Sequence, residues 1–95
     1  MRFLSLAAVL ALLLTPLVAQ KQAQVSDDTI VDQVRVKLIN DPDTGGQKID
    51  VDSHNGAVTI SGKVRSDKQR AKAEKLTKRV KGVVSVDNKL VVSPD

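Results

Sequence analysis

Few side chains of this sequence could take part in catalysis, and three of them lie close together. His54 is the only histidine, and a single imidazole can act as a general base or as a metal ligand. Asp50 and Asp52 lie two residues apart, so a strand would place both carboxylates on one face, as paired acid and base chemistry requires. We expect that face to be an open, solvated sheet surface with His54 beside a turn. The sequence therefore predicts no catalytic residue.

No metal, cofactor or thiol chemistry is predicted either. Residues Asp41 to Gly46 have a faint likeness to a calcium loop, but the alternating ligand series and the closing Glu are absent, so we interpret them as a turn. The sequence contains no cysteine, which excludes disulfides and thiolate ligands. These observations predict a protein that is not an enzyme and takes no small-molecule substrate.

The chain carries a strongly basic stretch from Lys63 to Lys81, with nine basic residues against Asp67 and Glu74. Four of the basic residues fall on one exposed side of a helix: Lys68, Lys72, Lys75 and Arg79. Such a stripe would attract anionic lipid headgroups, each near-surface charge contributing roughly 1 kcal/mol before screening. The alternative is an ordinary solvated helix face on a soluble protein.

The basic stripe belongs to an expected helix over about residues 67–81. Ser66 and Gln69 form the pattern of a capping box before it, and Gly82 is a natural residue for its end. Its apolar side consists of Ala73, Leu76, Thr77 and Val80.

An earlier helix is expected over about residues 27–40. Ser26 is a suitable N-cap before two aspartates, which favour the positive end of the helix dipole. Ile30, Val34 and Leu38 recur every four residues and predict the buried face.

A hairpin is expected between the two helices. Residues 48–54 alternate apolar and polar, and Asn55-Gly56 is the preferred two-residue type I′ turn because both positions need positive φ. The expected partners are His54 with Ala57, Asp52 with Thr59, Val51 with Ile60, and Ile49 with Gly62. This register gathers the apolar residues on one face, and a one-residue slip would destroy that agreement. We expect Gly62 on the inward face to let a helix approach closely.

The elements predict an α+β fold with the order helix, strand, strand, helix, strand. A last strand alternates inward at Val86, Leu90 and Val92, and two helices cover one face of a three-stranded mixed sheet. The other face is expected to be solvated and carries Asp50, Asp52, Thr59, Ser61 and Asp87.

The first nineteen residues have the pattern of a secretory signal peptide. Arg2 precedes an apolar run from Phe3 to Val18, and Ala19 suits the position before a cleavage site. A retained membrane anchor is the alternative. We therefore expect a signal peptide over 1–19, a flexible leader over 20–26, a domain over 27–93 and a periplasmic location.

The only aromatic residue is Phe3, which leaves the expected domain without one. Aromatic side chains provide the stacking platforms of many single-stranded nucleic-acid sites and the anchors of many interfaces. Export together with this absence argues against nucleic acid as a partner.

Three ordered motifs resemble the BON domain, a bacterial module of periplasmic and outer-membrane-associated proteins. They are the hairpin motif over 55–64 (NGAVTISGKV), the helix pair Ala73 and Leu76, and the strand motif over 82–92 (GVVSVDNKLVV). The likeness spans about residues 27–92. Thr77 departs from the small or aliphatic residue usual in the family, and the chain has room for one copy, whereas several members carry two.

This resemblance implies a non-enzymatic binding module associated with phospholipid, envelope integrity and osmotic-stress protection. One hypothesis is docking on anionic phospholipid through the stripe of Lys68, Lys72, Lys75 and Arg79. The other is a protein-interaction or chaperone-like module that binds envelope proteins through an exposed strand edge.

Overall fold

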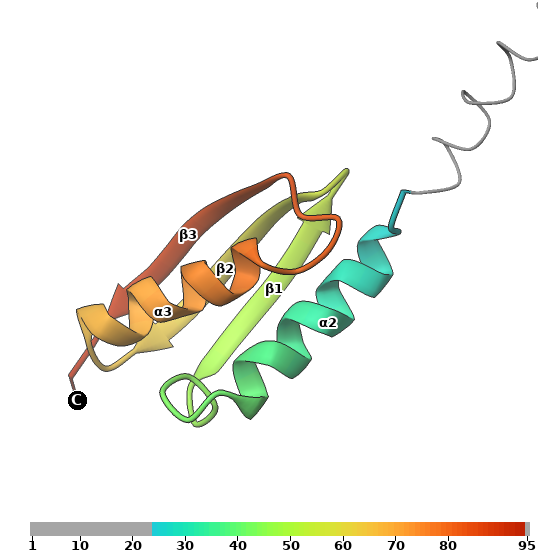
Figure 1. The fold of residues 1–95 in the computed structure, drawn as a ribbon. Helices are drawn as coiled ribbons and strands as arrows, with labels where there is room; N and C mark the ends of the chain where they lie inside the picture. The colour runs from blue at the N-terminus through green and yellow to red at the C-terminus, as the bar shows by residue number, and fades with distance from the viewer. Residues whose placement is uncertain (1–23, 95) are drawn as a thin grey trace, which may run out of the picture.

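In the computed structural model, which describes residues 24–94, two helices and three strands follow each other in the predicted order (Figure 1). They are α2 (Asp27–Asn40), β1 (Lys48–His54), β2 (Ala57–Val64), α3 (Asp67–Lys78) and β3 (Ser85–Val92). The α+β fold class is confirmed. The predicted signal peptide over 1–19 and the leader as far as residue 23 lie outside the described residues. No helix within 24–94 is long and apolar enough to cross a bilayer.

The sheet is mixed, with β2 in the centre, antiparallel to β1 and parallel to β3. Asn55 and Gly56 have φ angles of 51° and 85°, which fit the positive values that a type I′ turn needs. All four predicted pairings are observed: His54 with Ala57, Asp52 with Thr59, Val51 with Ile60, and Ile49 with Gly62. The hairpin register is therefore confirmed.

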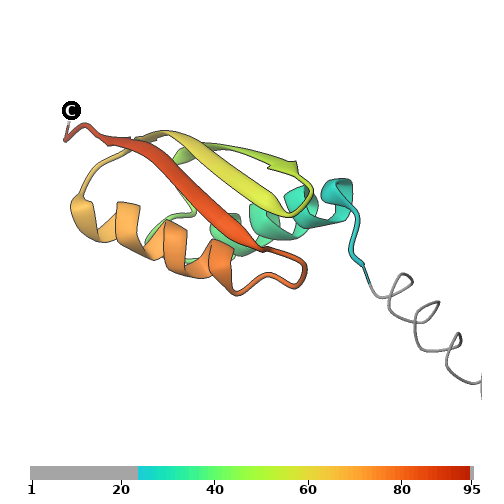
Figure 2. The ribbon, with the colours of Figure 1, turned by 90° about the horizontal axis from the view of Figure 1, so that it is seen from above.

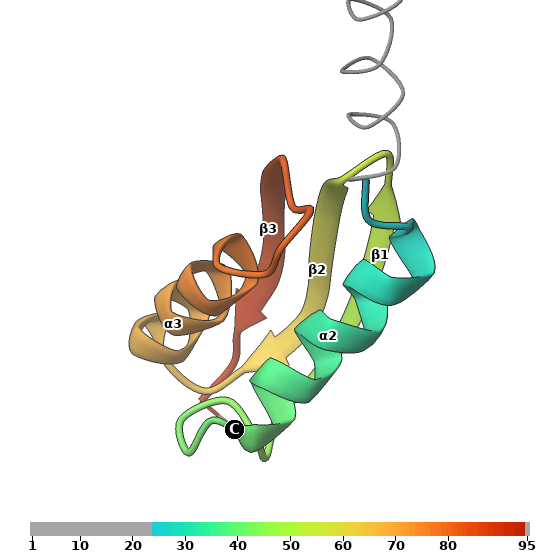
Figure 3. The ribbon, with the colours of Figure 1, turned by 45° about the vertical axis from the view of Figure 1, so that its right-hand side comes forward.

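Both helices lie on the same side of the sheet, so the domain has two layers (Figure 2). α2 covers the β1 side and α3 covers the β3 side (Figure 3). The core between the layers consists of Ile30, Val34, Leu38, Val51, Val58, Ile60, Val64, Ala73, Val80 and Leu90. On the opposite sheet face Asp50, Asp52 and Asp87 are exposed, as predicted, while Thr59 and Ser61 are half-buried.

α2 begins and ends as predicted, whereas α3 ends earlier, at Lys78 instead of Lys81. The N–H of Arg79 donates to the carbonyl of Leu76 at 3.2 Å, and the N–H of Val80 donates to Thr77 at 3.2 Å. This three-residue spacing tightens the last turn and ends the α-helix. Gly82, with a φ of 97°, then turns the chain toward β3.

We expected position 62 to need glycine because a helix approaches it closely, and that explanation is wrong. A Cβ at this position would lie 2.3 Å from the carbonyl oxygen of Lys48 on the neighbouring strand, and no helix atom is among the nearest contacts. Gly62 also has a φ of 123°, which side-chain-bearing residues rarely adopt. The backbone of β1 and the local backbone angle therefore require glycine here.

Candidate functional site

α3 presents basic residues to solvent because its other side is packed on the sheet. Ala73 and Thr77 are completely buried. The Thr77 hydroxyl donates to the carbonyl of Ala73 at 2.8 Å, so this polar group is satisfied within the core. The side of α3 opposite these two residues is left to solvent.

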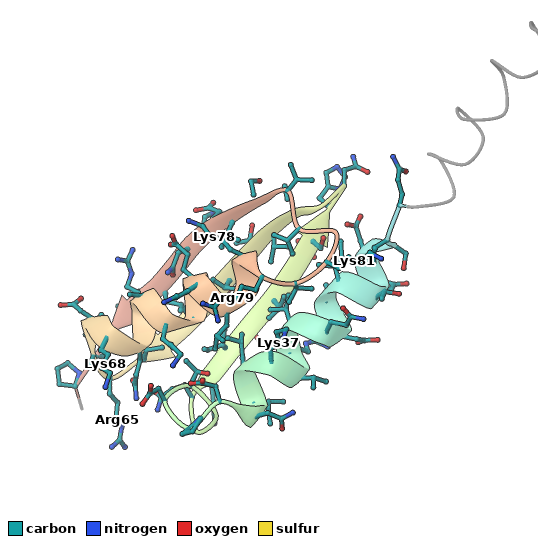
Figure 4. The ribbon with its side chains drawn as sticks, in the orientation of Figure 1. Lys37, Arg65, Lys68, Lys78, Arg79 and Lys81 are labelled. Carbon is teal, nitrogen blue, oxygen red and sulfur yellow. The ribbon has the colours of Figure 1, made fainter. Side chains whose placement is uncertain are left out.

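Three of the four predicted site residues form what we call the basic face: Lys68, Lys75 and Arg79. All three are exposed, and none has an ion-pair partner within residues 24–94. Figure 4 shows Lys68 near the start of α3 and Arg79 just past its end. The basic face therefore extends along the whole helix with its charges available to a ligand.

Lys72, the fourth predicted site residue, is placed differently. Its Nζ lies 3.5 Å from Asp41 Oδ1 and 3.5 Å from Asp43 Oδ2, in the loop that follows α2. The Lys72 side chain is 37% exposed and that of Asp41 is 13% exposed. Lys72 thus ties α3 to this loop, an arrangement that spacing along α3 could not indicate.

Two other basic residues of α3 also have partners. Lys78 Nζ lies 3.0 Å from Glu74 Oε2, one turn earlier, and the hydrogen bond from Lys78 is the main cause that lowers the pKa of Glu74. The Arg70 side chain reaches β3, where Nε donates to the carbonyl of Leu90 at 3.0 Å. Neither residue belongs to the basic face.

Figure 4 places three further exposed basic residues around this helical layer: Lys37, Arg65 and Lys81. Lys37 lies two positions, or about 200° of helix, after Arg35. Because Arg35 lines a pocket at β1, Lys37 belongs to the side of α2 that faces α3. Lys37 is not among the residues predicted from the sequence, because the helix pattern alone does not tell which side of α2 meets the neighbouring helix.

The residues considered for catalysis lie at alternate positions on one face of β1. His54, Asp50 and Asp52 are all exposed on the open sheet side, as expected for solvated groups. Within residues 24–94, no three His, Cys, Asp or Glu side chains gather in a way that could hold a metal ion.

Asp27 has a structural role beyond its place in the first turn of α2. Its carboxylate accepts hydrogen bonds from the Ser53 hydroxyl at 2.6 Å, the Asn55 N–H at 2.9 Å and the Gly56 N–H at 3.0 Å. These bonds, that from Ser53 first, hold the pKa of Asp27 below its ordinary value of 3.8. Asp27 thus fastens the start of α2 to the hairpin turn.

The chain is similar to a known protein family over almost all of its described residues. A family model described as the BON domain matches residues 26–94, from the N-cap of α2 to the end of the described chain. No curated protein matches the sequence.

Proposed function

The chain belongs to the BON domain family, and on that premise we propose that it docks on anionic phospholipid through the basic face of α3. The family is one of non-catalytic binding modules associated with the cell envelope. We further propose that the chain acts in the periplasm, after cleavage of the signal peptide over 1–19, in envelope maintenance or osmotic-stress protection.

The observation that carries this proposal is the availability of the charges on the basic face. Lys68, Lys75 and Arg79 are exposed and unpaired within the described chain. A planar anionic surface could contact them together, because they lie on one side of a single helix. Three such charges would contribute about 3 kcal/mol of membrane attraction before screening. Lys72 is excluded from this set because Asp41 and Asp43 already offset its charge.

The proposed docking is peripheral and electrostatic. The only aromatic residue of the sequence is Phe3, so the domain has none of the aromatic side chains that anchor proteins at the membrane interface. Val80 and Ala73 of the α3 region are buried and cannot enter the bilayer without unfolding the core. Binding should therefore depend strongly on salt, since the Debye length is only about 8 Å at physiological ionic strength.

Co-sedimentation with liposomes tests the proposal. A chain that starts at residue 20 is suitable, because it keeps every core residue and the whole family match but lacks the apolar run that would itself insert. We expect binding to vesicles containing phosphatidylglycerol at low salt, much weaker binding at physiological salt, and none to phosphatidylcholine vesicles. Failure to bind phosphatidylglycerol at low salt would overturn the proposal.

A further inference from the structure

The two edges of the sheet are not equivalent, because α3 closes the edge at β3. Arg70 donates from Nε to the carbonyl of Leu90 at 3.0 Å and from its guanidinium to the carbonyl of Asn88 at 3.4 Å. The Asn88 side chain accepts from the Leu90 N–H at 3.1 Å and donates to the Arg70 carbonyl at 3.0 Å. The middle of the β3 edge therefore has few groups left for a further strand.

The β1 edge has no such cover on its backbone groups. His54 and Ala57 flank the two-residue turn as a hydrogen-bonded pair, so alternate residues of β1 direct their backbone groups toward β2. The residues between them direct theirs outward: Ile49, Val51 and Ser53. Within residues 24–94 these three make no backbone hydrogen bond outside the sheet, and no side chain bonds to their backbone.

An apolar pocket lies at the start of this edge. It has a volume of about 340 Å³ and is formed between β1 and the C-terminal half of α2. Leu38, Ile39 and Ile49 supply its apolar wall, while Arg35 and Asp50 are among its polar residues. Ile39 is 67% exposed, so an apolar side chain placed here would cover surface that the domain leaves open.

We propose that the β1 edge binds an extended, basic segment of a partner protein as a fourth strand. Asp50 and Asp52 are exposed on the outer sheet face beside this edge, and they would lie next to Lys or Arg at alternate positions of the added strand. The intervening apolar residues would face the helix side, where one would enter the pocket at Ile39. This recognition mode needs neither lipid nor the basic face, so it is independent of the proposed function.

In one register, charge disfavours a second copy of the chain as the occupant of this edge. Antiparallel pairing of two β1 strands centred on Val51 would set Asp50 of each copy opposite Asp52 of the other. Like charges directly opposite each other destabilise a strand pair. The same two carboxylates favour a basic strand. A pairing of two copies centred on Ile49 would instead set Lys48 opposite Asp50, and protection that rises with chain concentration would reveal it.

The test uses the full-length chain and a fluorescent peptide of sequence Lys-Val-Lys-Val-Lys-Val. We expect saturable binding in fluorescence anisotropy, at least about tenfold weaker binding for the D50K/D52K variant, and similar weakening for a peptide that is N-methylated at alternate residues. The matched control is D67K/D87K, which makes the same charge change at exposed positions away from β1 and should bind normally. Hydrogen exchange should show new protection at Ile49, Val51 and Ser53.

Several results would overturn the inference. One is no binding of the Lys-Val peptide, and another is equal binding of the N-methylated peptide, which would show charge attraction without strand pairing. New hydrogen-exchange protection at β3 instead of β1 would show that the peptide binds the other edge of the sheet. Protection of β1 that rises with chain concentration and without peptide would assign the edge to a second copy. Equal binding of the Lys-Val peptide to D50K/D52K and to the wild type would show that the two carboxylates do not contribute to recognition.

Discussion

The Asp27 carboxylate accepts a hydrogen bond from the Ser53 hydroxyl at 2.6 Å, although the two residues are 26 positions apart. With the bonds from Asn55 and Gly56, this contact fixes the first turn of α2 against the hairpin. It joins two elements that each form from local signals but whose relative position those signals do not determine.

The Asp27→Asn variant should unfold at a lower temperature than the wild type at pH 7. The folded-state pKa of Asp27 is depressed below 3.8, so its stabilisation is present above that value and is lost as the pH falls through the folded-state pKa. Thermal unfolding followed by circular dichroism should therefore show a difference that shrinks as the pH is lowered below 3.8. Asp28→Asn, at the exposed neighbouring position, is the control. An equal, pH-independent loss in both variants would contradict the assignment.

Thr44→Val should destabilise the domain by about 1–3 kcal/mol. The Thr44 hydroxyl is buried and donates at 2.7 Å to the carbonyl of Leu38, one of the last four carbonyls of α2, which have no partner within the helix. Thr77→Val is the matched control, since the hydroxyl of Thr77 bonds to a carbonyl inside α3. We expect less than about 1 kcal/mol for this second change. Urea titration measures both, and equal losses would refute the distinction.

Gly62→Ala should cost at least about 2 kcal/mol of unfolding free energy. The new methyl group would meet the Lys48 carbonyl oxygen at 2.3 Å, and alanine would have to adopt a φ of 123°. Gly46→Ala is the control, because nothing lies within 4 Å of its Cβ position, and it should change stability by less than about 0.5 kcal/mol. A wild-type urea midpoint for Gly62→Ala would contradict the account of this glycine.

Lys72→Met should affect stability slightly and leave binding to anionic liposomes unchanged. The contacts of Lys72 with Asp41 and Asp43 are partly exposed, so their loss should cost at most about 1 kcal/mol. Urea unfolding and co-sedimentation of the same sample separate the two effects. A marked loss of liposome binding in a stably folded Lys72→Met protein would restore this residue to the proposed lipid surface.

Much of the fold could be predicted because its signals are local. The Asn55-Gly56 turn and the alternation on either side determine the hairpin register together, and Ser26 and Ser66 mark both helix starts. The sequence pattern extends α3 three residues too far, to Lys81 instead of Lys78, since the choice between a further α-turn and tighter bonding depends on how Val80 packs in the core.

Other features could not be predicted because they join residues far apart in the chain. The partners of Lys72 lie 29 to 31 positions away and contact it only after the loop folds against α3. The same holds for Asp27 with the hairpin and for Arg70 with β3. Helical spacing along α3 identifies which side is basic, but it cannot tell which of those charges are offset by another element.

The most direct test of the lipid proposal compares two triple variants at equal net charge. K68E/K75E/R79E reverses the basic face, while K48E/K63E/K89E reverses three exposed lysines on the strands, on the sheet face away from the helices. In co-sedimentation with phosphatidylglycerol liposomes at low salt, we expect the first variant to lose binding and the second to retain most of it. Equal losses in both would show that only net charge matters, and retained binding by the first variant would contradict docking through α3.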